Sequence, residues 1–301
     1  MRGILIRLAT VAGNGEPMAI DFRADDKGLG IAELKDMAKR VRSDIIRALG
    51  SSKSGHPGGS LSCTDILVAL YFSRLRHDPK DPKWPDRDRL LLSKGHAAPA
   101  LYSVLAECGY FPVEELSTLR RISSRLQGHP DPNKLPGIEI PGGPEGIGLS
   151  EGIGMALASR LDGRESRIYV IIGDGELDEG EVWEAAMAAV KFKLDNLTVI
   201  IDKNGVQQEG KTADIMPTNP VAKKFEAFNW NVIEIDGHDI ASIIGAIDKA
   251  RETHGGPTII VANTIKGKGV DFMEGRYEYH GKVPSPELLQ EALDQINGVS
   301  K

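Results

Sequence analysis

The sequence has 301 residues, of which 41% are hydrophobic and 27% are charged, so it is long enough to bury a sizeable core. The formal net charge of −6 and the isoelectric point of about 5.7 argue against nucleic acid as the main partner, because that role needs a basic surface. No apolar run approaches the roughly 20 residues of a membrane-spanning helix, so we expect no membrane partner. The two cysteines, Cys63 and Cys108, are too few for a disulfide framework and favour reduced thiols in the cytoplasm.

The first 30 residues differ in pattern from the rest of the chain. Residues 1–8 are basic and apolar, but no long apolar core with a small-residue cleavage site follows, so we expect no secretory signal. Met18 would serve equally well as a start, and residues 1–17 are therefore either a mis-assigned start or a disordered extension. We predict an N-terminal extension over residues 1–30 and a single domain over residues 31–301.

Hydrophobic periodicity predicts regular elements from residue 31 onward. Apolar residues at helical spacing predict a helix over Ile31–Leu49. The second half alternates strands and helices, with strands expected at Ile168–Ile172, Leu197–Ile201, Asn231–Ile235 and Thr258–Ala262, and helices at Glu179–Leu194 and Ile240–Arg251. This order predicts an α/β fold with a mainly parallel sheet and helices on both faces.

Polar residues end two neighbouring strands of this predicted sheet. Asp174 stands between two glycines after the first strand, and Asn204 follows the second. Parallel strands bring both to the same edge, where their oxygens would suit Mg²⁺ and the glycines would let a diphosphate approach. Each turn alone is more simply a tight turn, but the pair is harder to dismiss. A dinucleotide-binding fingerprint does not fit, because Asp178 stands where the third glycine is needed.

The stretch GDGELDEGEVWEAAMAAVKFKLDNLTVIIDKNGVQQEG resembles the thiamine diphosphate motif of the transketolase family, in which Gly-Asp-Gly is followed after about 30 residues by Asn. Four further segments resemble transketolases in the same order: SGHPGGSLS (54–62), RDRLLLSKGHAAPALY (87–102), LQGHPDPNKLPGIEIPGGPEGIGLSEGIGMALA (126–158) and TIKGKGVDFMEGRYEYHGK (264–282). The resemblance therefore runs from about residue 31 nearly to the end, and it implies the family's thiamine-diphosphate-binding fold.

The resemblance implies a set of cofactor and metal ligands. Asp174, Asn204 and the backbone carbonyl of Val206 would hold Mg²⁺, or Ca²⁺ or Mn²⁺ in its place. The further residues implied to bind or border the cofactor are His96, Gly143, Pro144, Glu145, Gly175, Glu179, Asn204, Lys266 and His280, with Glu179 at a subunit interface. Lys94 and Lys282 also match family lysines near the channel, although solvated surface lysines remain an open alternative.

Four of the seven histidines fall in these motifs. The resemblance implies that His56 and His280 act on the carbonyl and hydroxyl of the sugar donor and that His129 contacts the neighbouring hydroxyls. Carbon–carbon cleavage and ligation require proton transfers, and imidazole titrates near neutral pH. The other three histidines, His77, His238 and His254, lie in polar stretches, and we interpret them as surface or core residues.

Glu145 departs from the family pattern. Many transketolases have Leu in the loop where this chain has Gly143-Pro144-Glu145, and that leucine lies against the cofactor. A buried, unpaired carboxylate is costly, so Glu145 must be protonated, paired or turned outward. We interpret it as the mark of a divergent cofactor environment or an unusual substrate.

The chain resembles only the first part of a full-length transketolase. The pyrimidine-binding domain, with the glutamate that activates the cofactor and the groups that bind sugar phosphate, is not matched. The resemblance therefore predicts the N-terminal subunit of a split transketolase, working with a separate C-terminal subunit in an α₂β₂ assembly. It would transfer a two-carbon ketol unit from a ketose phosphate to an aldose phosphate.

Two alternatives remain open for the function. One is a subunit of another split thiamine diphosphate enzyme, similar to a 2-oxo acid dehydrogenase alpha subunit or to deoxyxylulose-phosphate synthase. These share the Gly-Asp-Gly and Asn signature but not the full set of histidine motifs. The other is a non-catalytic binding subunit, and the intact metal and histidine positions argue against it. The sequence does not separate one sugar donor from another.

Overall fold

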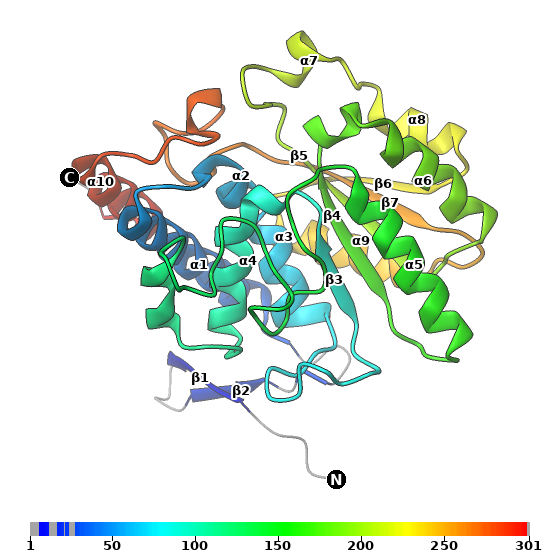
Figure 1. The fold of residues 1–301 in the computed structure, drawn as a ribbon, viewed down its shortest axis with the longest axis horizontal. Coiled ribbons are helices and arrows are strands. Elements are labelled where there is room, and N and C mark those ends of the chain that lie inside the picture. The colour runs from blue at the N-terminus through cyan, green and yellow to red at the C-terminus, as the bar shows by residue number, and fades with distance from the viewer. Residues whose placement is uncertain (1–5, 12–16, 21, 24–27, 300–301) are drawn as a thin grey trace.

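The computed structural model describes residues 6–11, 17–20, 22–23 and 28–299. Its centre is a five-stranded parallel sheet with helices on both faces (Figure 1). The predicted α/β fold is therefore confirmed.

The sheet has the strand order β3-β4-β5-β7-β6, and every neighbouring pair is parallel. Its strands are β3 (Arg89–Leu92), β4 (Ile168–Gly173), β5 (Leu197–Lys203), β6 (Asn231–Asp236) and β7 (Thr258–Asn263). The four predicted strands are present, each one or two residues longer at its carboxyl end. Strand β3 was not predicted, because its three apolar residues form a run too short to separate from the motif around it.

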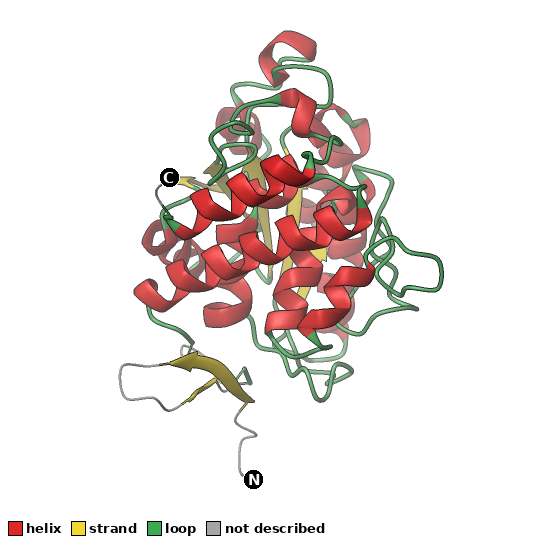
Figure 2. Ribbon diagram, turned by 90° about the vertical axis from the view of Figure 1, so that its left-hand side faces the viewer, coloured by secondary structure: helices red, strands yellow, loops and turns green. Residues whose placement is uncertain are grey.

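Alternate residues of the strands face two separate cores, as a sheet buried on both sides requires. Tyr169 and Ile171 of β4 face the core formed with α1, α3, α4 and α9, whereas Val170 and Ile172 face the core formed with α5, α6 and α8. The helices of the first core are α1 (Ile31–Ser52), α3 (Thr64–Ala69), α4 (Ala98–Glu107), α9 (Ile240–Glu252) and α10 (Pro286–Asn297); those of the second are α5 (Ile147–Leu161), α6 (Gly180–Lys191) and α8 (Val221–Ala227). Helices of the first group cover the sheet in the view of Figure 2.

The predicted helices are present with small changes at their ends. The first helix continues three residues beyond its predicted end, to Ser52. The helix predicted over Glu179–Leu194 begins at Gly180, because Glu179 is its extended N-cap, and ends at Lys191. The two short helices α2 (Pro57–Ser62) and α7 (Thr212–Ile215) belong to loops at the carboxyl edge of the sheet.

The N-terminal region forms a separate two-stranded antiparallel sheet of β1 (Ile6–Val11) and β2 (Pro17–Ile20) (Figure 1). Residues 1–5, 12–16, 21 and 24–27 lie outside the described residues. The division at residue 30, and the status of residues 1–17, therefore stay predictions. In the described part of the chain, no helix is both long and apolar enough to cross a membrane.

Candidate cofactor and metal site

A cavity of about 530 Å³ lies at the carboxyl edge of β4 and β5. This volume falls within the range of about 300–1,000 Å³ typical of small-molecule sites. Its lining includes His56, Lys94, His96, His129, Gly143, Glu145, Asp174, Gly175, Glu176, Glu179, Asn204, Val206, Gln207, Lys266 and His280. Every cofactor, metal and catalytic residue predicted from the sequence borders it except Pro144, and exposed Lys282 also lies outside the lining.

Asp174 and Asn204 lie side by side because β4 and β5 are paired in register, with Gly173 opposite Asp202. Asp174 is buried, and one of its oxygens accepts hydrogen bonds from Gly205 N at 2.8 Å and from the Thr212 hydroxyl at 3.1 Å. Burial and the nearby Asp202 carboxylate raise the pKa of Asp174 above its ordinary value. A cation at this place would stabilise the ionised carboxylate.

Two more oxygens lie next to this carboxylate. The Asn204 side-chain oxygen accepts a hydrogen bond from Val206 N at 3.1 Å, and the Val206 carbonyl accepts one from Lys266 Nζ at 3.1 Å. Among the described residues, no three His, Cys, Asp or Glu side chains are grouped to hold a metal. The donor set of one carboxylate, one amide and one carbonyl nevertheless fits Mg²⁺, which takes few protein ligands and completes its octahedron with phosphate and water.

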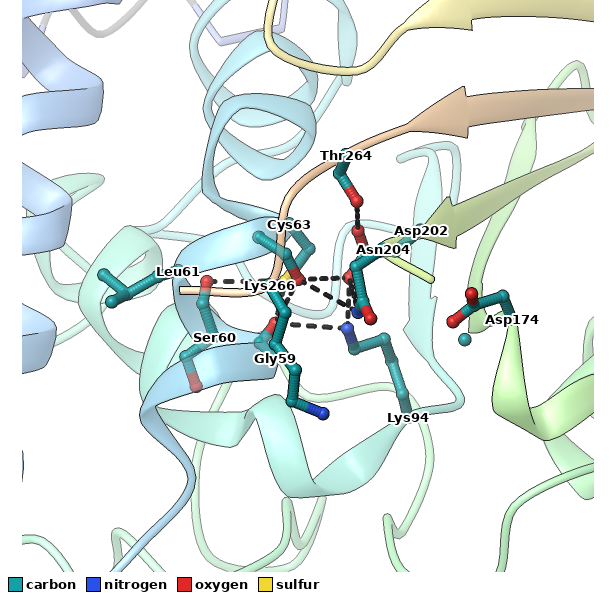
Figure 3. Close-up of polar contacts among 12 residues, drawn as sticks. Gly59, Ser60, Leu61, Cys63, Lys94, Asp174, Asp202, Asn204, Thr264 and Lys266 are labelled. Carbon is teal, nitrogen blue, oxygen red and sulfur yellow. Dashed lines mark hydrogen bonds and ion pairs between the residues drawn. The ribbon is translucent and has the colours of Figure 1, made fainter. Parts of the chain in front are cut away.

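A buried ion pair between Lys94 and Asp202 lies at this edge of the sheet. Asp202 was not predicted from the sequence. Lys94 donates to Asp202 and to the Gly59 carbonyl, and Thr264 also donates to the Asp202 carboxylate (Figure 3). The Ser62 hydroxyl donates to the same carboxylate. Burial alone would lower the pKa of Lys94, but the Asp202 carboxylate outweighs it and the pKa lies above its ordinary value. Lys94 is therefore a fixed positive charge beside the cavity.

Three histidines form a compact cluster on the other wall of the cavity. The ring centroids of His56, His96 and His280 lie 4.9–5.4 Å apart. Burial, with repulsion from the neighbouring rings and lysines, lowers the pKa of His56 to about 4 and that of His280 to about 3. These rings are neutral near pH 7, so each can accept or donate a proton. His129, at the exposed mouth, has its pKa lowered by burial and by Arg120.

Lys266 connects the histidine cluster with the oxygen ligands. Its ammonium lies 3.0 Å from His280 Nδ1 and also bonds the Val206 carbonyl. Burial and the charge of Lys94 lower the pKa of Lys266 to about 8. A bound anion such as a diphosphate would stabilise the protonated form of Lys266 and raise its pKa toward the ordinary value.

Two local features fit such an anion. The Nδ1 atom of His56 is buried and has no hydrogen-bond partner within the described chain, so this nitrogen beside the cavity is unsatisfied. Gly143 has a φ of 138°, and a Cβ placed there would meet open space rather than protein. A ligand can therefore approach the backbone of this loop closely.

Glu145 is paired, which decides among the possibilities that the sequence left open. Its carboxylate lies 3.0 Å from His96 Nδ1, and its side chain is 37% exposed. Burial would raise the pKa of Glu145, but the hydrogen bond from His96 and the positive charge of Lys94 outweigh burial and lower it. Glu145 is therefore an ionised carboxylate inside a site that is otherwise rich in histidine and lysine.

Glu176 is a second residue that the sequence analysis missed. Its buried carboxylate accepts hydrogen bonds from the Ser93 hydroxyl, from Gly146 N at 2.9 Å and from Gly173 N at 3.0 Å. It thereby ties together the ends of β3 and β4 and the loop that carries Glu145. The only sequence signal was its place in the turn after Gly-Asp-Gly.

Comparison with known proteins accounts for this arrangement. Residues 33–288 match the family described as the thiamine diphosphate binding domain of transketolase. The chain belongs to the transketolase family. It is 44% identical over 264 residues to the 6-deoxy-6-sulfo-D-fructose transketolase subunit SqwG of Clostridium sp. (strain MSTE9), covering 88% of this chain and 96% of that protein. It is also 44% identical to one of the subunits of the apulose-4-phosphate transketolase of Actinobacillus succinogenes, covering 89% and 97%.

Solved transketolases share the fold but are longer. The transketolase of Campylobacter jejuni superposes with a TM-score of 0.84 at 35% identity, covering 89% of this chain and 43% of that chain. This transketolase chain thus spans less than half the length of the solved relatives and nearly all of the relatives named as subunits. The predicted family, the predicted N-terminal subunit of a transketolase and the thiamine diphosphate-binding domain are confirmed, whereas the roles of individual site residues stay predictions.

Proposed function

We propose that this chain is the diphosphate-binding half of an enzyme that transfers a two-carbon ketol unit from a ketose phosphate to an aldose phosphate. The observation that carries the proposal is the convergence of His56, His129 and His280 on the cavity that also contains Asp174 and Asn204. The full set of histidines favours a transketolase over other thiamine diphosphate enzymes. It also favours a catalytic over a purely structural subunit.

The residues at the ends of β4 and β5 would hold the metal and the diphosphate. Asp174, Asn204 and the Val206 carbonyl would bind Mg²⁺, or Ca²⁺ or Mn²⁺ in its place, with diphosphate oxygens as further ligands. Lys266 and His96 would face the diphosphate, and Gly175 would let it approach the backbone. When bound, thiamine diphosphate supplies the carbanion chemistry, which no amino-acid side chain can supply.

The histidines would orient the sugar and move protons. His56 and His280 lie on one wall, where they would bond the carbonyl oxygen and adjacent hydroxyl of the donor. Their low pKa values keep them neutral, so each ring can donate from one nitrogen and accept at the other. His129, at the mouth, would bond the next hydroxyls along the chain of the sugar.

A second subunit would complete the active site. We propose a C-terminal partner that carries the pyrimidine-binding half and the activating glutamate, in an α₂β₂ assembly. Exposed Glu179, at the start of α6, is the residue that we place at this interface. Two buried, free cysteines are compatible with a cytoplasmic location, which we also propose.

Reconstitution tests the proposal directly. Ketol transfer would be measured with the chain alone and with the product of a neighbouring reading frame, in the presence of thiamine diphosphate and Mg²⁺. The donors would be pentose and hexose ketose phosphates, apulose 4-phosphate and 6-deoxy-6-sulfo-fructose, the last two taken from the relatives' names. We expect transfer only in the mixture. Binding of the cofactor without transfer from any donor would favour a different thiamine diphosphate reaction.

A further inference from the structure

His238 makes two hydrogen bonds that define its tautomer. The backbone N–H of Ile265 donates to His238 Nε2 at 2.8 Å, so this nitrogen carries no proton. The proton therefore lies on Nδ1, which is 2.8 Å from a carboxylate oxygen of Asp65. The side chain of His238 is only 13% exposed, which fits a core rather than a surface histidine.

Asp65 is itself held in place by a buried arginine. Arg42 of α1 donates to both carboxylate oxygens of Asp65, at 2.9 and 2.6 Å, and its guanidinium also donates to the Leu61 carbonyl. Burial would raise the pKa of Asp65, but Arg42 and His238 outweigh it and keep the carboxylate ionised. The chain Arg42–Asp65–His238 thus runs from helix α1 through α3 to the loop after β6, with little freedom at any member.

These hydrogen bonds end on the backbone of residues 264–267, the segment that carries Lys266. Several hydrogen bonds hold the segment, among them those from the Thr264 hydroxyl to Asp202, from Ile265 N to His238, and from Gly267 N to the Gly58 carbonyl at 3.0 Å. Lys266 passes close over Gly58, where a Cβ would lie 2.8 Å from the Lys266 side chain. Figure 3 shows Thr264 and Lys266 on this segment beside the Asp202 network.

We propose that His238 is a positioning residue that fixes the backbone at Ile265, so that the ammonium of Lys266 stays at the Val206 carbonyl. This inference rests on the proposed function, because it takes the diphosphate as the partner of Lys266. His238 is not among the residues that line the cavity. Its effect passes through one backbone hydrogen bond next to Lys266.

Two substitutions separate the two bonds of His238. In His238→Gln the amide oxygen takes the place of Nε2 and can accept from Ile265 N, whereas the bond to Asp65 is lost. In His238→Asn the amide NH₂ takes the place of Nδ1 and can donate to Asp65, whereas the bond to Ile265 is lost. Each variant loses one of the two bonds, so a purely structural role predicts similar effects on stability and on the site.

The first readout is hydrogen exchange of the Ile265 amide in the full chain without ligand. We expect exchange about tenfold faster in His238→Asn and close to wild type in His238→Gln. The second readout is binding of thiamine diphosphate with Mg²⁺ by calorimetry, in the presence of the partner subunit. We expect about tenfold weaker binding for His238→Asn and at most about a twofold change for His238→Gln. Thermal unfolding of both variants checks that they are folded.

The outcomes distinguish this inference from the proposed function. Equal exchange or equal affinity in the two variants would overturn the positioning role while leaving the cofactor site intact. A wild-type complex that does not bind thiamine diphosphate would contradict the proposed function, and with it the role of His238. Faster exchange of the Ile265 amide and weaker cofactor binding in His238→Asn, with both near wild type in His238→Gln, would establish the positioning role.

Discussion

Two cavities lie at opposite edges of the same sheet, and they differ in how their charges are satisfied. The cavity at the amino edge is the larger, at about 780 Å³ against about 530 Å³, and arginines surround it. There Arg164 pairs with Asp86 and Asp162, and Arg160 donates to the carbonyls of Phe192 and Lys193. These arginines bond to the chain's own carboxylates and helix ends.

The carboxyl edge shows the opposite arrangement. Burial lowers the pKa of His56, His280 and Lys266, and the charge of Lys266 adds to the effect on both histidines. His56 Nδ1 is buried without a partner within the described chain. Unsatisfied electrostatics, rather than cavity size, therefore distinguishes the edge that we propose as the cofactor site. Substitutions at the amino edge should change stability, and those at the carboxyl edge should change ligand binding.

The largest expected effect follows from Asp174→Asn. The change keeps the size of the side chain but removes the only carboxylate of the predicted metal ligand set, so we expect affinity for thiamine diphosphate with Mg²⁺ to fall at least about 100-fold. Calorimetry on the complex with the partner subunit measures this. Asp248→Asn, which removes a carboxylate paired with Arg74 at the amino edge, is the matched control and should leave affinity unchanged. A loss below about threefold in Asp174→Asn would count against the metal site.

The next effect is on stability, at the amino edge. Arg76→Met leaves the buried Asp88 carboxylate without its cation, so we expect the free energy of unfolding to fall by about 2 kcal/mol near pH 8. Burial already raises the pKa of Asp88, and a raised pKa means that stability is lost as pH rises. The penalty should therefore shrink near pH 5, which urea unfolding at both values would show. A matching loss of cofactor affinity in Arg76→Met would contradict the expectation that the amino edge affects stability and not ligand binding.

A smaller effect concerns acid stability at the carboxyl edge. The pKa of His280 is lowered from 6.5 to about 3 by burial and by Lys266, so its stabilising contribution is complete above pH 6.5 and is lost as pH falls toward 3. His280→Asn should make the ligand-free chain lose about 1–2 kcal/mol less between about pH 7 and pH 4.5. Chemical denaturation at the two values provides the test, with His254→Asn at the amino edge as the control substitution. Parallel profiles for His280→Asn and wild type would contradict the lowered pKa.

The smallest expected effect comes from Glu145→Leu. Because the Glu145 carboxylate is paired with His96, we expect it to compete with a diphosphate, so its removal should tighten binding of thiamine diphosphate by about threefold to tenfold. Glu145→Gln separates charge from size and should give most of the same gain. Unchanged affinity and unchanged turnover in both variants would remove the hypothesis that Glu145 marks a divergent site.

The sequence predicts those parts of the fold and site that depend on local pattern. The β-branched run of β4 and the helical spacing of α1 each predict their element, and two matched strand ends predict that Asp174 and Asn204 meet. Strand β3 was missed because four residues carry too little periodicity.

The parts that could not be predicted depend on contacts between distant segments. Asp202 looks like one more charge after a strand, and its burial follows from Lys94, which lies far away in the sequence. Likewise, the pairing of Glu145 with His96 and the contact of His238 with Ile265 exist only once the loops have assembled. No local signal distinguishes these residues from solvated ones.

The decisive experiment on the proposed site is a crystal structure of the chain with its partner subunit, thiamine diphosphate and Mn²⁺, in which anomalous scattering locates the metal. We predict one Mn²⁺ bound by Asp174, Asn204 and the Val206 carbonyl, with the diphosphate against Lys266 and His96. A metal bound elsewhere, or a diphosphate away from the ends of β4 and β5, would contradict the assignment of this edge as the cofactor site.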